Sequence, residues 1–480
     1  MLYMCNGTDA NKWDGTTTTK WGITAPSTAP TLSFSSGSLS PVSKIGYSYV
    51  YTFENSSTGH ISTASPQSAN TGPRTSKNIG VSGDRSTDAQ VDKINIYRTL
   101  DGSTTYNFLT QIANPPSGTW SYTDSTADTG LNDDVHPSLD HLNDPPPAGI
   151  SNVIFHMGRM WVSVDNLVYF GAGGDTLSGI PEECFPPANV FKFPGKVTGL
   201  LSHSAGLLVF TSDNVYIIYG SDTLTFASKM WLDNFGVKTP NCIAQDGDLF
   251  YIYTSRRQLF EIGSSLTEVG WAIGDQLKAN FDPTSSSLAL HRNGSDAGLF
   301  ISNGTTDMFR YNLSFQCWSP VARPTGGINF ISSIETVAGT WTLLGGRAAV
   351  SQYILGRDLS SFTDDGGTYS AYATVGTIVL APPGQQFGLD SILVERMPMG
   401  SAHTLSVLLN EISGTFTTIP NPVSDLWQLP ATTSVISQRH DLRAATAPLP
   451  QIMRHLQIKI AFASEAAKNE LLGLAVKAIQ

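Results

Sequence analysis

The sequence predicts an all-β protein, in which a β-propeller-like body carries an inserted β-sandwich. Three observations support this fold class. Charged residues make up only 14% of the chain, against about 25% in average globular proteins. Short apolar runs alternate with clusters of Ser, Thr, Asn and Gly, a pattern typical of strands and turns. Strand–turn–strand units also recur after Pro147, and 480 residues are too many for a single hydrophobic core.

Residues 1–22 predict an N-terminal hairpin that joins the propeller body. The two strands of LYMCNGTDANKWDGTTTTKWG meet at Asn6-Gly7, a pair that suits the positive φ angles of tight turns. We expect this hairpin to close the ring of the propeller against C-terminal strands, because closure removes exposed sheet edges.

Residues 31–144 predict a separate sandwich, because proline-containing linkers at 22–31 and 143–149 bracket a segment of ordinary domain size. Residues 45–53 and 93–112 alternate apolar and polar side chains, and 119–125 add a short strand. In the second of these segments, we expect Tyr106, Phe108, Thr110 and Ile112 to share one face. Short alternating strands with frequent turns favour a fibronectin-type-III-like or immunoglobulin-like sandwich.

Residues 150–480 predict the propeller-like body. Five similar units begin at Ser151, Lys196, Pro240, Ser287 and Ile328. Their spacing is close to the roughly 40–50 residues of a four-stranded propeller blade. Each unit contains three recognisable strands separated by polar turns.

Four later segments predict C-terminal closing strands, at residues 387–397, 403–412, 453–462 and 470–479. The last is expected to be a strand and not a helix, because Leu472, Leu474 and Val476 alternate with smaller or polar residues.

Composition also narrows the possible partners and compartments. The formal net charge is −11 and no basic run is present, which disfavours tight nucleic-acid binding. No apolar stretch approaches the length of a membrane span, and the N-terminus does not look like a signal peptide. We therefore expect a soluble protein, made in a cytoplasm and without stable membrane insertion.

The sequence predicts no catalytic residues and no cofactor. It has no GxSxG, GxxxxGK[ST] or strand-associated GxGxxG motif. Residues 363–370 begin like a sialidase turn repeat, but the aromatic residue comes too early and no second copy occurs. The carboxylate pairs Asp133-Asp134, Glu182-Glu183 and Asp364-Asp365 are adjacent, so on strands they would point to opposite faces instead of flanking one bond.

Metal binding is not expected either. The densest group of potential ligands is His136, Asp140, His141 and Asp144, in a proline-rich loop that lacks a metal-site spacing. The Asp246-Gly247-Asp248 segment lacks the further ligands of a calcium loop.

Cysteine and tryptophan residues are assigned to packing. Cys5, Cys184, Cys242 and Cys317 lie far apart without a CxxC pair, and we expect mostly buried thiols. Trp13, Trp21 and Trp120 could stack on sugars or fill interfaces, and we favour packing.

One family resemblance emerges from the succession of GRMWVSVDNLVYFGAGGD, GLLVFTSDNVYIIYGSD and FGVKTPNCIAQDGDLFYI, together with KINIYRTLDG in the sandwich. This order resembles the tail nozzle, or tail-tube, proteins of short-tailed bacteriophages. One departure is that the chain begins almost directly at LYMCNG, where such proteins usually have a longer N-terminal part. We therefore expect a docking region to be missing, shortened or supplied by another chain.

The resemblance implies a structural protein of the virion tail. It implies a homo-oligomeric ring, a hexamer, below the portal and adaptor, in contact with the adaptor and with other tail proteins or fibres. Genomic DNA would pass through the channel without specific binding. The alternative is a non-enzymatic propeller module of the tail that binds a host receptor or glycan.

Overall fold

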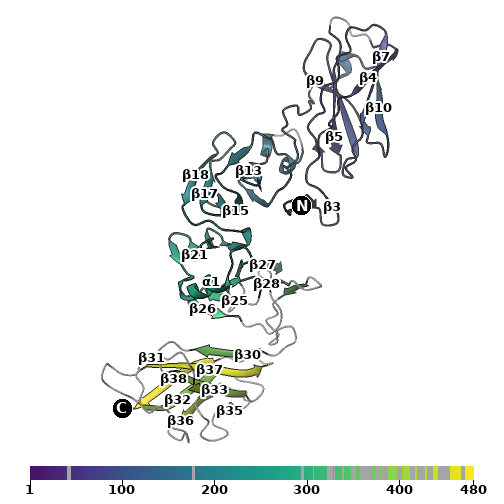
Figure 1. Cartoon of the computed structure of the whole chain (residues 1–480). Coiled ribbons are helices and arrows are strands. Elements are labelled where there is room, and N and C mark those ends of the chain that lie inside the picture. The colour runs from purple at the N-terminus through teal and green to yellow at the C-terminus, as the bar shows by residue number, and fades with distance from the viewer. Residues whose placement is uncertain are drawn as a thin grey trace. The chain divides into compact units, whose positions relative to one another are not determined.

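The computed structural model of the chain is almost entirely β (Figure 1). It describes residues 1–39, 45–175, 179–292, 297–305, 307–321, 328, 330–337 and 340–347, and the backbone of the strands between 353 and 479. The one α-helix among these residues is α1 (Gly274–Asn280). The chain divides into two compact units, Met1–Trp271 and Ala272–Gln480. The predicted all-β class is confirmed.

The N-terminal segment forms a three-stranded antiparallel sheet of β1 (Leu2–Cys5), β2 (Ala10–Trp13) and β3 (Thr18–Lys20). The turn between β1 and β2 is the predicted one, because Gly7 has a φ of +88° and the Asn6 side-chain oxygen accepts two backbone N–H groups. The side chains of Tyr3 and Cys5 pack on the core of the first four-stranded sheet. The expected closure against C-terminal strands stays a prediction.

Residues 31–124 form two antiparallel sheets that pack face to face (Figure 1). One sheet has the order β10-β7-β4 and the other β6-β5-β8-β9. Their bounds are β4 (Thr31–Ser36), β5 (Tyr49–Asn55), β6 (His60–Ile61), β7 (Lys77–Asp84), β8 (Lys93–Thr99), β9 (Tyr106–Ala113) and β10 (Thr119–Asp124). Tyr51 and Ile96 from one sheet meet Ile79 and Trp120 from the other in a single core. The sandwich thus lies inside the predicted 31–144 segment, and its immunoglobulin or fibronectin type stays a prediction.

One expectation for the hairpin of β8 and β9 is wrong. Tyr97 pairs with Phe108 but Ile96 pairs with Thr110, so Leu109 is an extra residue in a β-bulge. A bulge reverses the alternation of side chains along the strand. Phe108 therefore packs with Tyr97, while Ile112 packs in the core between the two sheets.

A ladder of hydroxyl groups covers the free edge of β5. We call Ser62, Ser65, Ser68 and Thr71 the hydroxyl ladder. Each hydroxyl accepts the N–H of an alternate residue of the β5 segment at 2.8–3.1 Å and donates to the carbonyl of the residue that follows it. The backbone N–H of each ladder residue returns a bond to the same partner. Outward-facing backbone groups along β5 are thus satisfied without a full neighbouring strand.

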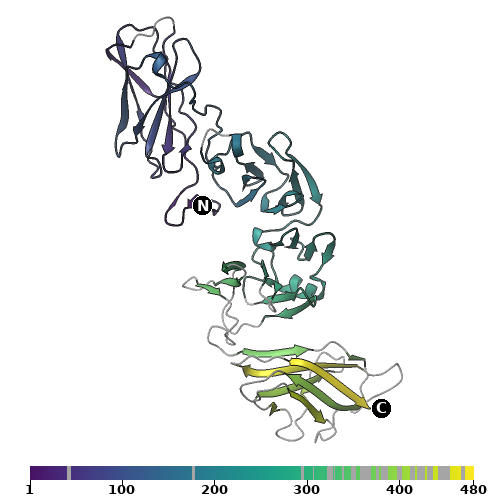
Figure 2. The same cartoon turned by 180° about the vertical axis from the view of Figure 1, so that it is seen from behind.

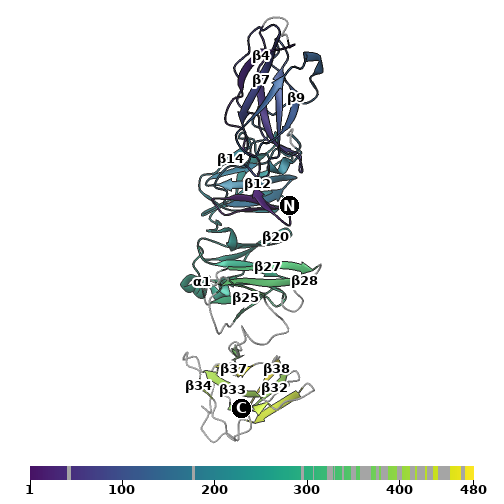
Figure 3. The same ribbon diagram turned by 90° about the vertical axis from the view of Figure 1, so that its right-hand side faces the viewer.

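The predicted repeats are confirmed as a series of antiparallel sheets, the pattern of propeller blades. Four have four strands in sequence order, and the fifth has three among the described residues. Their strands are β11 (Asn152–His156), β12 (Arg159–Val164), β13 (Leu167–Phe170) and β14 (Val190–Lys192); β15 (Val197–His203), β16 (Gly206–Thr211), β17 (Val215–Tyr219) and β18 (Ala227–Leu232); β19 (Ile243–Asp246), β20 (Leu249–Tyr253), β21 (Leu259–Ile262) and β22 (Leu266–Glu268); β23 (Ser287–His291), β24 (Gly298–Ser302), β25 (Met308–Asn312) and β26 (Cys317–Pro320); and β27 (Phe330–Val337), β28 (Thr340–Arg347) and β29 (Tyr353–Gly356). Figure 3 shows β27 and β28 side by side.

Successive blades bury aromatic and aliphatic side chains between their faces. Trp161 and Phe170 of the first blade pack with Leu207 and Val209 of the second, and Trp161 is fully buried. The Trp161 indole N–H donates to the carbonyl of His156 at 3.0 Å, which satisfies its polar group inside the core.

The C-terminal segments form two further sheets, in which strands distant in the sequence pair with each other (Figure 2). All four predicted segments are strands, including residues 470–479. The bounds are β30 (Tyr369–Thr374), β31 (Ile378–Val379), β32 (Gly388–Arg396), β33 (His403–Asn410), β34 (Thr417–Thr418), β35 (Gln428–Leu429), β36 (Ile436–Asp441), β37 (His455–Glu465) and β38 (Leu471–Ile479). In the described backbone, β32 lies between β36 and β38, which is not the sequential order of the blades. The assignment of residues 150–480 to one propeller body stays a prediction.

The hydroxyl ladder generates a stability prediction. Replacing Ser65 with Ala leaves the buried N–H of Tyr51 without its acceptor, which we expect to cost about 1–3 kcal/mol. The measurement is amide hydrogen exchange across residues 47–55 in the intact chain. Ser57→Ala, an exposed serine, serves as control, and equal exchange in both variants would contradict the proposed role of the ladder.

Candidate functional site

The entry linker of the sandwich (residues 22–31) and its exit linker (residues 143–149) meet at a junction. Lys12, Gly22, His60, Pro145 and Glu183 form this junction. A Cβ atom at Gly22 would lie 2.8 Å from Pro145 Cβ, and Gly22 has a φ of +82°. Both observations explain why glycine occupies this position. Gln90 of the sandwich donates from Nε2 to the carbonyls of Lys20 (3.2 Å) and Gly22 (2.9 Å), which ties the entry linker to the sandwich.

A buried ion pair lies at the centre of the junction. Lys12 Nζ, from β2, lies 2.6 Å from both carboxylate oxygens of Glu183, which belongs to the first blade. The two side chains are 3% and 0% exposed. The Gly22 N–H also donates to Glu183 Oε2 at 3.2 Å. The carboxylate therefore has the partners that a buried charge requires.

His60 connects the sandwich to this ion pair. Its Nε2 lies 3.9 Å from Glu183 Oε2, and its side chain is fully buried. Burial is the main reason that the pKa of His60 falls from 6.5 to about 3, and the Lys12 ammonium is the second. Burial raises the pKa of Glu183, and the hydrogen bond from Lys12 opposes this rise. His60 is consequently neutral at physiological pH.

Two more contacts fix the exit side of the junction. The Gly179 N–H donates to the Gly59 carbonyl at 3.2 Å, and Asn143 Nδ2 donates to the Ile61 carbonyl at 2.9 Å. These bonds hold the turn around His60 to the first blade and to the exit linker.

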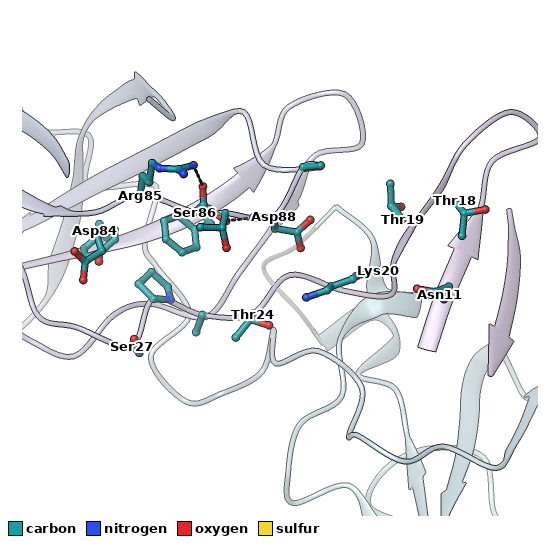
Figure 4. Close-up of a pocket in the computed structure, with 16 residues that line it drawn as sticks. Asn11, Thr18, Thr19, Lys20, Thr24, Ser27, Asp84, Arg85, Ser86 and Asp88 are labelled. Carbon is teal, nitrogen blue, oxygen red and sulfur yellow. Dashed lines mark hydrogen bonds between the residues drawn. The ribbon is translucent and has the colours of Figure 1, made fainter. Parts of the chain in front are cut away.

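A polar groove of about 570 Å³ lies beside the junction (Figure 4). One wall is Asn11 and β3, and the other is the loop after β7. The lining residues are Asn11, Thr18, Thr19, Lys20, Thr24, Ala25, Pro26, Ser27, Tyr51, Phe53, Asp84, Arg85, Ser86, Thr87, Asp88 and Ala89.

The charged groups of the groove balance. Lys20 and Arg85 supply cationic donors, and Asp84 and Asp88 supply acceptors. Asp84 accepts a hydrogen bond from Thr28 at 2.8 Å, and Asp88 accepts two from Gln90. The arrangement is suited to hydrogen bonding with an uncharged polar ligand. Glu183, buried in the junction, does not line the groove.

Of the potential metal ligands between residues 136 and 144, the structure pairs two and places His136 elsewhere. His141 pairs with Asp144 at 3.0 Å and is 64% exposed, while His136 Nδ1 lies 2.7 Å from the Tyr106 carbonyl. Asp248 follows the turn at Gly247 and accepts the Ser204 N–H. In the part of the chain that the structure describes, no group of three or more His, Cys, Asp or Glu side chains is placed to hold a metal ion.

The packing assignments are confirmed for two of the three tryptophans. Trp21 and Trp120 are buried, and their indole N–H groups donate to the carbonyls of Glu182 and Asp84. Trp13 is 41% exposed. Among the cysteines, which are free thiols, Cys184 and Cys242 are buried, Cys5 is half-buried and Cys317 is exposed.

One candidate segment, the sialidase-like turn at residues 363–370, lies mostly outside the described residues. Residues 363–368, including Asp364-Asp365, fall outside them. No helix among the described residues is both long and apolar enough to cross a membrane.

The sequence did not point to Lys12 or Gln90. Lys12 lies on the same inward face of β2 as Ala10. A lysine at a position where the alternation calls for an apolar residue was the one feature of the sequence that could have indicated a buried ion pair. Its partner Glu183 is 171 residues away, and local patterns do not connect such positions.

The ion pair generates a prediction about single and paired substitutions. Lys12→Met leaves the Glu183 charge buried without its partner, which we expect to destabilise the unit by about 3–5 kcal/mol. Lys12→Met combined with Glu183→Gln should recover most of this loss, because no buried charge remains. Calorimetric unfolding of the wild type, both single variants and the double variant measures the coupling. Additive single effects would contradict a direct interaction.

The buried histidine generates a prediction about pH. Between pH 6.5 and about 3, the unfolded chain binds a proton at residue 60 that the folded chain does not. The free energy of unfolding contributed by His60 should therefore decrease as pH falls, by up to about 1.4 kcal/mol per pH unit. The raised pKa of Glu183 has the opposite effect on the free energy of unfolding. The wild type and the variant His60→Gln both contain Glu183, so this effect is shared. His60→Gln should show a shallower loss of stability between pH 6.5 and 4 than the wild type, and parallel curves would refute the assignment.

Comparison with known proteins gives structural likenesses of low similarity. No protein-family model matches the sequence, and no curated protein does. The chain is similar to BBS1N in its crystal structure with ARL6DN (13% identity, 68% of this chain and 84% of the other, TM-score 0.31). It is also similar to the exo-beta-1,3-galactanase of Phanerochaete chrysosporium (10% identity, 83% and 93%, TM-score 0.23) and to the WD40 repeats of RRP9 (12% identity, 57% and 70%, TM-score 0.27).

Proposed function

We propose that this chain is a structural protein of a short-tailed bacteriophage virion, without catalytic turnover. In this proposal it forms the tail nozzle or tube ring, which continues the DNA-ejection channel below the portal and adaptor. The serial four-stranded sheets and the sandwich between the N-terminal sheet and the first blade support the proposal. Their order along the chain is that of the segments that resemble the tail nozzle proteins.

The buried junction is the observation that carries the proposal furthest. The sandwich is fixed at both its entry and exit by Lys12, Glu183 and the bonds around His60. An element held in one orientation loses little conformational entropy when it contacts a neighbour. Such fixation suits a building block of a large assembly.

The proposed assembly is a homo-oligomeric ring, a hexamer, whose further contacts are the adaptor and other tail proteins or fibres. A closed ring needs one heterologous interface that is repeated by rotation, and therefore two different complementary surfaces on each chain. The sandwich offers a second surface beside the blades.

The charge of the chain is compatible with a channel for DNA. Each subunit carries a formal net charge of −11, and a ring multiplies this charge by its number of copies. Acidic surface along a channel keeps the duplex from binding during ejection, since phosphate neutralisation is what gives non-specific affinity.

The assembly prediction can be tested with purified protein. We expect closed rings in electron micrographs, and we expect deletion of residues 31–144 to weaken ring formation more than it weakens the fold of the remaining sheets. Light scattering reports assembly and circular dichroism reports the fold. A chain that remains monomeric on its own and lies as isolated copies on the outside of the virion would contradict the proposal. So would a channel wall lined mainly by Lys and Arg.

A further inference from the structure

The polar groove continues onto an exposed face of the N-terminal sheet. Asn11, Thr18, Thr19 and Lys20 line the groove. Trp13 lies directly opposite Thr18 in the β2–β3 register, and Asn11 lies opposite Lys20. Directly opposed residues of antiparallel strands share a face, as do residues two apart on one strand. Trp13 is not itself among the lining residues. Its side chain lies on the face of the sheet that carries Asn11, Thr18 and Lys20, next to the groove, while Thr19 lies on the opposite face.

The exposure of Trp13 distinguishes it from the packed tryptophans. Its side chain is 41% exposed, whereas Trp21 and Trp120 are 3% and 2% exposed. A tryptophan ring presents a flat apolar surface, and its burial by a ligand stabilises the complex. The C–H face of a pyranose ring is a ligand surface of the same flat, apolar kind.

The groups inside the groove match the remaining surface of a sugar. A saccharide hydroxyl both donates and accepts hydrogen bonds, so its site needs donors and acceptors interleaved. Lys20 and Arg85 donate, Asp84 and Asp88 accept, and Thr18 can do both. The volume of about 570 Å³ is within the range of roughly 300–1,000 Å³ that is usual for small-molecule sites.

We propose that this groove is a binding site for a neutral short oligosaccharide, with Trp13 stacking on one sugar ring at the rim. The equal numbers of cationic and anionic side chains select against a charged ligand. The many charged groups also make the groove unlike the core of a protein–protein interface, where charge is depleted. The site is additional to the proposed ring and does not depend on it.

The test uses the full-length protein and a panel of neutral tri- and tetrasaccharides of glucose, galactose, mannose and rhamnose, with sialylated oligosaccharides as charged counterparts. Saturation-transfer NMR detects binding, and titration gives the Kd. We expect saturable binding of at least one neutral member and a weakening of about tenfold in Trp13→Ala. Trp271→Ala is the matched control, because Trp271 is 76% exposed and lies in the short helix Trp271–Ile273, outside the N-terminal sheet and the sandwich that line the groove.

A second variant tests the groove without altering the tryptophan. Ser27→Arg places a long side chain at an exposed lining position and should abolish binding, whereas Trp13→Ala only weakens it. Thermal unfolding checks that each variant is folded. The proposal is overturned if no neutral saccharide of the panel binds, or if only the sialylated members bind. It is equally overturned if Trp13→Ala and Ser27→Arg bind as the wild type does, or if the groove proves to be filled by a protein partner.

Discussion

The buried contact between Lys12 and Glu183 is the interaction on which the arrangement of the first unit depends. It joins a strand near the N-terminus to a loop of the first blade, across the whole length of the sandwich in sequence. Removing two charges from water is costly, and only close geometry with additional hydrogen bonds offsets the cost. Both carboxylate oxygens lie 2.6 Å from the ammonium, and the Gly22 N–H adds a further bond. The pair therefore tolerates little displacement of the three segments that meet there.

The charges inside the junction balance. His60 is kept neutral by burial and by the neighbouring ammonium, so the junction contains one cation and one anion, and no second positive charge competes for Glu183. The entry linker also lines the polar groove, whose charged side chains balance. The stretch from Asn11 to Ser27 thus contributes to both features. Lys12 and Gly22 contact Glu183, and Asn11 with residues 18–20 and 24–27 lines the groove.

Much of the fold could be predicted from the sequence, because buried inner strands carry a local apolar signal. The five repeat starts correspond to β11, β15, β19, β23 and β27. In the first four sheets the next strand, β12, β16, β20 or β24, is buried along nearly its whole length. The outer strands lack this signal: all three residues of β22 are exposed, and β14 alternates between exposed and half-buried positions. Leu109 shows a second limit, since an inserted bulge residue changes no composition but reverses the face of the residues around it. The junction was not predictable, because its charged partners are distant in sequence and are brought together only by tertiary packing.

The hydroxyl ladder protects the edge of β5 against pairing with a strand of another molecule. An unprotected strand edge can recruit the edge of another molecule, and repeated recruitment leads to aggregation. Along β5, short serine and threonine side chains occupy the positions that a foreign strand would need, and they do so at every third residue. This edge of the module is therefore closed to strand exchange between copies. Any contact made along this edge would depend on side chains, which can be specific for one partner.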